Sequence, residues 1–282
     1  MEDALHTNGK MASNRFHRFI EYYIKGVIPY FSTFSNSGRV LIRFFLNRHL
    51  PPPPMYLRNK FSYGRKIGFF VDKFPSGGGH FSAVFYRNEY GPLDVAGKTV
   101  IDVGASIGDT AIYFLIKGAK RVIAIEPNIL AIHYLQRNIN LNRFDDKITV
   151  VNAAVGREHS TMIIDPSSPP ETGYKPNVAA VGVEISVIPL ADIIESLGHD
   201  VVLKLDCEGC EFEALESIPS SILSNVDEIF LEFHRNPITI ANRLEAAGFG
   251  VEYDRTSNMG YLHARNVYAS RAKHLDSMTN QH

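Results

Sequence analysis

The sequence predicts an α/β fold built on a mostly parallel sheet with helices on both faces. From Lys98 onward, short runs of β-branched residues alternate with helical patterns, which is typical of parallel strands joined by crossover helices. The first run ends in a glycine-rich turn within Val100–Gly108, and a helical pattern follows at once. At 282 residues, 45% of them hydrophobic, the chain is long enough to bury a sizeable core.

The first strand is expected at 99–103, and a helix after the turn is expected because Ile112, Leu115 and Ile116 share helical spacing. Further strands are expected at 121–126, 147–153, 200–206 and 226–233, and further helices at 128–142, 190–197, 211–217 and 238–247. Two last apolar runs, 251–253 and 261–268, predict an antiparallel pair of strands that ends the domain.

The first 54 residues differ in composition from the rest of the chain. Amphipathic helices are expected from Asn14 and from Ser37, and the prolines at 51–54 end the second one. Residues 1–50 hold seven Lys or Arg and three Asp or Glu. We therefore expect a helical, basic N-terminal extension over 1–54 that caps the domain after it. The alternative is peripheral contact with a membrane surface or a partner through residues 1–50.

The other predicted parts are a β-hairpin-like lead-in at 55–95, the main domain at 96–270 and a disordered tail at 271–282. The lead-in is inferred from strand-like runs at 67–71 and 81–85. Inside the main domain, strand-like runs at 161–164 and 181–188 flank a Pro- and Ser-rich segment. The insertion at 160–187 is therefore either a mobile lid or a long hairpin tip.

The glycine turn predicts a ligand site. Backbone N–H groups and the helix dipole converge at a helix N-terminus, and Gly104 and Gly108 allow the backbone to approach a ligand closely. Asp102 can accept a hydrogen bond from a cationic amine or a bridging water. Glu126 ends the second strand about 20 residues later, where an acidic side chain accepts from both hydroxyls of a ribose. The pair predicts a nucleoside site, and the alternative is a turn with no ligand.

The identity of the nucleoside follows from charge. A dinucleotide fingerprint requires glycine where this chain has Ser106 and Asp109. A pyrophosphate would face Asp102 and Asp109, and this arrangement is electrostatically unfavourable. S-adenosylmethionine has no phosphate and carries a sulfonium and an ammonium, so carboxylates around the turn suit it. The sequence therefore favours S-adenosylmethionine as the cofactor.

These residues resemble a known family. The similarity rests on Val100–Gly108, Ile125–Asn128, Asn138–Asn142, Val151–Gly156 and Leu203–Glu211, of which Lys-Leu-Asp-Cys-Glu-Gly-Cys-Glu is the most specific element. In these motifs the chain resembles the FkbM family of S-adenosylmethionine-dependent methyltransferases over roughly 85–268. The resemblance implies a Rossmann-like seven-stranded sheet and O-methylation of a small molecule, a sugar or a lipid-linked glycan. It also implies that Tyr90 lies near the cofactor.

Ligands of open α/β sheets bind at the carboxyl ends of the strands, which gathers the candidate residues at one edge. The predicted cofactor-binding residues are Tyr90, Asp102, Val103, Gly104, Ala105, Gly108, Asp109, Glu126, Pro127, Asn128, Asn152, Ala153 and Asp206. The side chain of Asn152 either contacts the adenine edge or caps a turn, and both interpretations stay open.

The predicted catalytic residues are Asp206, Glu208 and His234. O-methylation requires a base that removes the proton of the acceptor hydroxyl, and a carboxylate or a histidine can act as that base. We expect Asp206 or His234 to be the base and Glu208 to orient the acceptor. A divalent metal held by these three side chains is possible in chemical terms but is not favoured.

The two cysteines, Cys207 and Cys210, form a single C-x-x-C, which is a weak metal signal, so we expect reduced thiols packed beside the site and no metal. No apolar run reaches the ~18 residues of a membrane span, and the first ten residues are too polar for a secretory signal. We therefore expect a cytoplasmic protein; the oligomeric state is left open.

The formal net charge of −1 argues against a broadly basic nucleic-acid binder. The expected partner is a small-molecule or glycan acceptor. An RNA methyltransferase is the alternative within enzymes, and a non-catalytic nucleoside-binding or scaffold protein is the alternative outside them.

Overall fold

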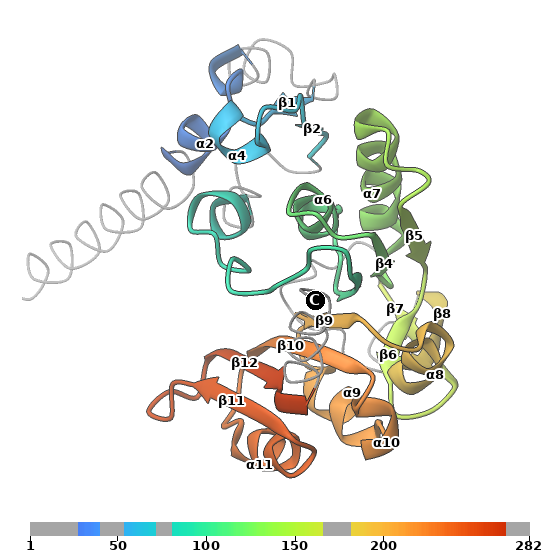
Figure 1. Ribbon diagram of the computed structural model, residues 1–282. Helices are drawn as coiled ribbons and strands as arrows, with labels where there is room; N and C mark the ends of the chain where they lie inside the picture. Colours follow the sequence, from blue (N-terminus) through green and yellow to red (C-terminus); the bar gives the residue numbers. More distant parts are fainter. Residues whose placement is uncertain (1–27, 40–53, 72–80, 166–181, 269–282) are drawn as a thin grey trace, which may run out of the picture. The chain divides into compact units, whose positions relative to one another are not determined.

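The computed structural model describes residues 28–39, 54–71, 81–165 and 182–268 (Figure 1). The chain divides into two compact units, Met1–Glu89 and Tyr90–His282. The predicted divisions after residues 54 and 95 remain predictions. The helix expected from Asn14 and most of the one expected from Ser37 lie outside the described residues, although residues 37–39 are helical. The described part of the chain has no helix of the length and apolarity that a membrane crossing requires.

The first unit has an aromatic core. Its elements are α2 (Ile28–Thr33), β1 (Met55–Tyr56), α4 (Asn59–Ser62), β2 (Gly68–Phe69) and the π-helix η2 (Ser82–Tyr86). Strands β1 and β2 pair antiparallel, whereas the predicted hairpin involved the runs at 67–71 and 81–85. The ring of Phe81 lies 5.0 Å from those of Phe34 and Phe69, and Phe85 lies 5.7 Å from Phe69.

The strand expected at 81–85 is wrong, because this segment is helical. A helical turn brings Phe81 and Phe85 to the same side, where both rings contact Phe69.

The second unit is built on the predicted sheet. Its strands are β3 (Thr99–Val103), β4 (Arg121–Ile125), β5 (Ile148–Val151), β9 (Val201–Leu205), β10 (Val226–Phe233), β11 (Phe249–Tyr253) and β12 (Gly260–Asn266). They lie in the order β11-β12-β10-β9-β3-β4-β5. Strands β10, β9, β3, β4 and β5 pair in parallel, whereas β12 pairs antiparallel with both β10 and β11. The predicted seven-stranded sheet and its final antiparallel pair are confirmed.

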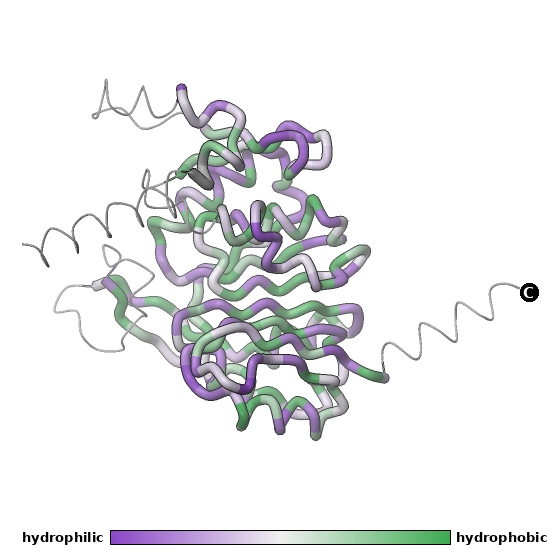
Figure 2. The backbone as a smooth tube through the Cα atoms, turned by 90° about the vertical axis from the view of Figure 1, so that its left-hand side faces the viewer, coloured by the Kyte–Doolittle hydropathy of each residue, from purple (hydrophilic) through white to green (hydrophobic). Residues whose placement is uncertain are grey.

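Helices cover both faces of this sheet (Figure 1). They are α6 (Asp109–Ile116), α7 (Ile129–Asn142), α8 (Leu190–Leu197), α9 (Glu211–Ser217), α10 (Ser220–Leu223) and α11 (Ile238–Ala246). One hydrophobic cluster joins the sheet to α8, α9, α10 and α11, through residues such as Ile101, Leu203 and Leu215. Figure 2 shows hydrophobic residues recurring along these strands. Because side chains alternate along a strand, Asp102 and Lys204 point to the opposite face from Ile101 and Leu203.

A second, three-stranded sheet lies at the predicted insertion. Strands β6 (Ala154–Gly156), β8 (Val183–Pro189) and β7 (Ser160–Ile164) are ordered β6-β8-β7, and β7 pairs antiparallel with β8. The two strand-like runs of the insertion therefore form a hairpin. Its Pro- and Ser-rich segment lies outside the described residues, so the choice between lid and hairpin tip stays a prediction.

Candidate active site

The glycine turn follows β3 at the carboxyl edge of the sheet. Gly104 has a φ of +75°, and a Cβ atom at this position would lie 1.8 Å from the carbonyl oxygen of Asp206. Only glycine allows the turn and the end of β9 to approach so closely. The N–H groups of Gly104 and Ala105 donate to the carbonyl of Ile125 at 3.0 and 3.1 Å. Asn138, from α7, donates to the carbonyl of Ile107 at 2.9 Å.

Asp102 lies beneath this turn and is fully buried. The register of β3 and β9 places it beside Lys204, whose Nζ lies 3.0 Å from its Oδ1, and Thr110 donates to its Oδ2 at 2.5 Å. The sequence predicted a contact of Asp102 with a ligand amine or water, and this contact stays a prediction. In the structure, Thr110 donates to one oxygen, and Lys204 from the neighbouring strand lies beside the other. Lys204 is a site residue that the sequence interpretation missed.

Charge stabilises Lys204 in its buried position. Burial by itself lowers the pKa of the Lys204 ammonium, but the attraction of Asp102 and then of Asp206 outweighs it and raises this pKa above its usual value. The ammonium therefore stays protonated, and its Nζ donates to the carbonyls of Val103 and Gly104 at 3.1 and 3.0 Å.

Glu126 is 3% exposed and organises the turn from β4. Its Oε2 accepts from the N–H of Ser106 at 2.9 Å, and its Oε1 accepts from the N–H of Asn128 at 2.8 Å. Burial raises the pKa of the Glu126 carboxyl, and this effect outweighs the hydrogen bonds from the N–H groups of Asn128 and Ser106, which lower the pKa. Each oxygen keeps a second lone pair, so the carboxylate can also accept from a ligand hydroxyl.

Two predicted asparagines hold the backbone around Glu126. The side chain of Asn128 caps α7 by accepting from the N–H groups of Leu130 and Ala131. Asn152 donates to the carbonyls of Glu126 and Pro127, both at 3.1 Å. In this structure, the amide nitrogen of Asn152 therefore supports the chain segment after β4.

Asp206 follows β9 and contacts the residue that the family resemblance singled out. The hydroxyl of Tyr90 donates to Oδ2 of Asp206 at 3.3 Å, and Nζ of Lys204 lies 4.0 Å from the same oxygen. The ring of Tyr90 packs edge-on against Phe114 and Phe230, which fixes its position. Tyr90 and Asp206 are 116 positions apart in the sequence.

The turn between β9 and α9 is closed by a covalent bond and by a carboxylate. Cys207 and Cys210 form a disulfide, so the prediction of two reduced thiols is wrong. Glu208 and Gly209 adopt positive φ values of 58° and 125°, and this tight turn brings the two sulfur atoms together. Glu211 is buried and accepts from the N–H groups of Cys207 and Gly209.

The third predicted catalytic residue, His234, follows β10 and lies among acidic side chains. Its Nε2 is 3.9 Å from Glu208 and 3.8 Å from Glu232. The His234 side chain is 37% exposed, so solvent and ligands can reach the imidazole. Within the described ranges, no three His, Cys, Asp or Glu side chains form a group that could hold a metal ion.

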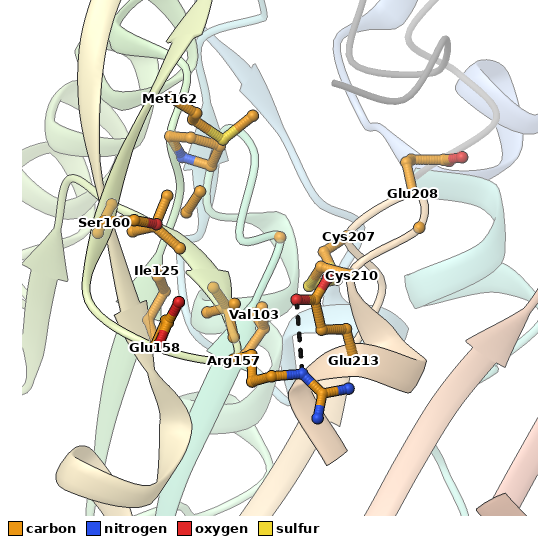
Figure 3. Close-up of a pocket in the computed structure, with 18 of the residues that line it drawn as sticks. Val103, Ile125, Arg157, Glu158, Ser160, Met162, Cys207, Glu208, Cys210 and Glu213 are labelled. Atoms are coloured by element: carbon orange, nitrogen blue, oxygen red, sulfur yellow. Dashed lines mark ion pairs between the residues drawn. A yellow bond between two sulfur atoms is a disulfide. The ribbon is translucent and has the colours of Figure 1, made fainter. Parts of the chain in front are cut away.

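A cavity of about 520 Å³ opens at the same edge of the sheet. One wall contains Cys207, Cys210 and Glu213, and the opposite wall contains Ser160 and Met162 from β7 (Figure 3). Its floor includes the apolar residues Val103 of β3, Ile125 of β4 and Ala153, which precedes β6. The volume lies in the range of about 300–1,000 Å³ that is usual for small-molecule sites.

Comparison with known proteins identifies the family. The model of the methyltransferase FkbM domain matches residues 102–260 of the chain. The chain belongs to the FkbM family of S-adenosylmethionine-dependent methyltransferases. The predicted family is thereby confirmed, and the match begins at Asp102, beneath the glycine turn, and ends at Gly260, the first residue of β12.

Similar proteins include other methyltransferases. The FkbM chain is 40% identical over 55 residues to the ribosomal protein L11 methyltransferase of Carboxydothermus hydrogenoformans, and this match covers 20% of the chain and 18% of that relative. The chain thus spans under a fifth of that relative's length. Among solved structures, a putative RNA methyltransferase of Pyrococcus horikoshii is 16% identical with a TM-score of 0.37, over 70% of this chain and 86% of that one. A putative methyltransferase of Escherichia coli is 14% identical with a TM-score of 0.40, over 72% and 93%.

The residues that line the cavity include five of the predicted ones in this FkbM protein, whereas Asp206, His234 and Glu126 are not among those residues. Val103, Gly104, Pro127, Ala153 and Glu208 line the cavity directly. Ala105, Gly108 and Asp109 form the turn and the start of α6, where Asp109 is buried.

Sequence reasoning named no individual residue of the small sheet as part of the site. Arg157 lines the cavity after β6 and pairs with Glu213 at 3.9 Å and with Glu216 at 3.4 Å. No motif signalled this residue, because its role depends on how the small sheet lies against α9.

Proposed function

We propose that this protein transfers a methyl group from S-adenosylmethionine to a hydroxyl group of a small molecule, a sugar or a glycan. The observation that carries the proposal is the position of Asp206, Glu208 and His234. They follow two neighbouring parallel strands, β9 and β10, and Glu208 also lines the cavity next to the glycine turn. A base near the methyl donor is what O-methylation requires.

The residues around the glycine turn suit the methyl donor. The cavity floor is apolar at Val103, Ile125 and Ala153, which fits an adenine ring, and Glu126 can accept from ribose hydroxyls. S-adenosylmethionine, when bound, supplies an electrophilic methyl group on a sulfonium. We assign Asp206 to the ammonium of the donor, because its carboxylate is held in place by the hydroxyl of Tyr90.

We assign the base to His234. Its Nε2 lies within 4 Å of Glu208 and of Glu232, and its side chain is 37% exposed, so an acceptor hydroxyl can reach the imidazole. Asp206 is the weaker candidate, since its Oδ2 already faces Tyr90 and Lys204. We assign Glu208 to the orientation of the acceptor hydroxyl, since its carboxylate lies 3.9 Å from His234.

Two measurements test the proposal. The first is calorimetric titration of the full chain with S-adenosylmethionine, beside Asp206→Asn and the control Glu252→Gln, whose side chain is 76% exposed on β11. We expect binding by the unchanged chain and by the control, and weaker binding by Asp206→Asn. Absence of binding by the unchanged chain would contradict the methyltransferase proposal and favour a scaffold protein.

The second measurement is transfer of labelled methyl groups to a panel of polyols, monosaccharides, glycans and total RNA. We expect label on hydroxylated acceptors, and a loss of kcat of about 10²–10⁴-fold in His234→Gln with unchanged affinity for the methyl donor. Label in RNA instead would favour the RNA methyltransferase alternative. Unchanged kcat in His234→Gln together with its loss in Asp206→Asn would move the base to Asp206.

A further inference from the structure

The buried ammonium of Lys204 has more contacts than charge neutralisation requires. Its side chain is 1% exposed, and Asp102, which is fully buried, already supplies the opposite charge at 3.0 Å. A buried cation needs such a partner, because an unpaired charge in the protein interior is costly. The ion pair alone does not account for the direction of the other two N–H groups of the ammonium.

Those N–H groups point to the glycine turn. Nζ lies 3.1 Å from the carbonyl oxygen of Val103 and 3.0 Å from that of Gly104. These carbonyls accept two of the three donors that a lysine ammonium offers, while Asp102 is its ion-pair partner. The N–H groups of Gly104 and Ala105 donate to Ile125 on the other side. The backbone of the turn is therefore fixed on the β4 side by Ile125 and on the β9 side by Lys204.

Lys204 also connects the turn to the end of its own strand. Its Nζ is 4.0 Å from Oδ2 of Asp206, two residues along the chain, and its ammonium lies 5.8 Å from the centre of the Tyr90 ring. The buried Lys204 ammonium thus lies close both to the glycine turn and to Asp206, the carboxylate that we assign to the ammonium of the methyl donor.

We propose that Lys204 is a positioning residue that holds the Val103–Gly104 backbone in the conformation that binds S-adenosylmethionine. This inference rests on the proposed function. Lys204 acts through the turn and through Asp206, and it does not itself contact the cavity. When its contacts with the two carbonyls are lost, the turn can leave the conformation that binds S-adenosylmethionine. The affinity for S-adenosylmethionine then falls, whereas the rate of the methyl-transfer step changes less.

The test uses the double variant Lys204→Met/Asp102→Asn, which removes both buried charges and keeps the side chains close to their original size. The control is Thr110→Val, which removes a hydrogen bond to Asp102 within the same cluster and leaves the contacts of Lys204 with the turn intact. Three quantities are compared in the full chain: the midpoint of thermal unfolding, the affinity for S-adenosylmethionine, and amide hydrogen exchange of the residues after β3.

We expect the double variant to bind S-adenosylmethionine about 10- to 100-fold more weakly, as two charge-assisted hydrogen bonds to the turn are lost. The KM for the donor should rise with a smaller change in kcat. The amides of Gly104 and Ala105 should exchange faster in the double variant, while Thr110→Val keeps both donor affinity and slow exchange at these amides.

Two results would overturn the inference. Equal weakening of donor binding in Thr110→Val would show that the whole cluster acts through stability alone. Unchanged exchange at Gly104 and Ala105 in a folded double variant would show that Lys204 does not hold the turn. The exchange measurement needs no cofactor, so it decides the role of Lys204 even where the unchanged chain fails to bind S-adenosylmethionine and the proposed function is refuted.

Discussion

Replacement of Gly104 by alanine tests the close approach of the glycine turn to the end of β9. The φ of +75° costs any residue with a Cβ atom about 1–2 kcal/mol. In addition, the new Cβ atom would lie 1.8 Å from the carbonyl oxygen of Asp206, which is backbone and cannot rotate away. Forced displacement of packed backbone adds about 1–3 kcal/mol. The free energy of unfolding should therefore fall by about 2–5 kcal/mol in total.

The chain offers a matched control for this variant. Gly97 has a φ of +73°, and nothing lies within 4 Å of its hypothetical Cβ atom. Gly97→Ala should therefore cost only the backbone term of about 1–2 kcal/mol. Both glycines belong to the unit Tyr90–His282, so one urea transition, followed by circular dichroism, reports on both variants. Equal losses in the two variants would refute the argument that the contact with Asp206 requires glycine.

Further predictions concern Glu126 and the disulfide. The pKa of the Glu126 carboxyl is raised in the folded chain above its usual value of 4.5. The contribution of Glu126 to the free energy of unfolding is therefore fully present below pH 4.5, and it is lost as the pH rises through the folded-state pKa. Glu126→Gln removes this titration, so the free energy of unfolding measured in urea should depend less on pH above 4.5. An unchanged pH dependence would contradict the raised pKa of Glu126. For the disulfide, thiol titration of the denatured chain should find no free thiol before treatment with a reductant and two thiols after it, since Cys207 and Cys210 are the two cysteines of the sequence. Two thiols before reduction would show that the turn after β9 closes without the bond.

Local patterns predicted most elements of the large sheet. Strands β3 and β10 and helices α8 and α9 begin and end at the predicted residues. Their apolar periodicity, together with caps and glycines, acts over a few residues and can be recognised in the sequence. The sequence also placed Gly104, Pro127, Ala153 and Glu208 at one site, because the carboxyl ends of parallel strands meet at one edge.

The lead-in and the insertion were predicted less well. The aromatic run at 81–86 has the composition of a strand, but its contacts with Phe34 and Phe69 accompany a helical conformation. The hairpin of β7 and β8 was inferred, whereas its pairing with β6 was not, and the cavity residues Ser160 and Met162 were not named. These features depend on which elements meet in space, and local propensity does not encode that choice.

The sequence by itself determined the alternation of strands and helices, the glycine turn, and the residue types that identify the FkbM family. Those properties come from short-range spacing and from motifs within a few residues of one another. Only the tertiary structure decided that Asp102 pairs with Lys204, that Tyr90 reaches Asp206, and that both oxygens of Glu126 hold backbone N–H groups. Asp102 and Lys204 lie about a hundred positions apart, and the register of β3 and β9 places them side by side in the interior, where each buried charge requires the other.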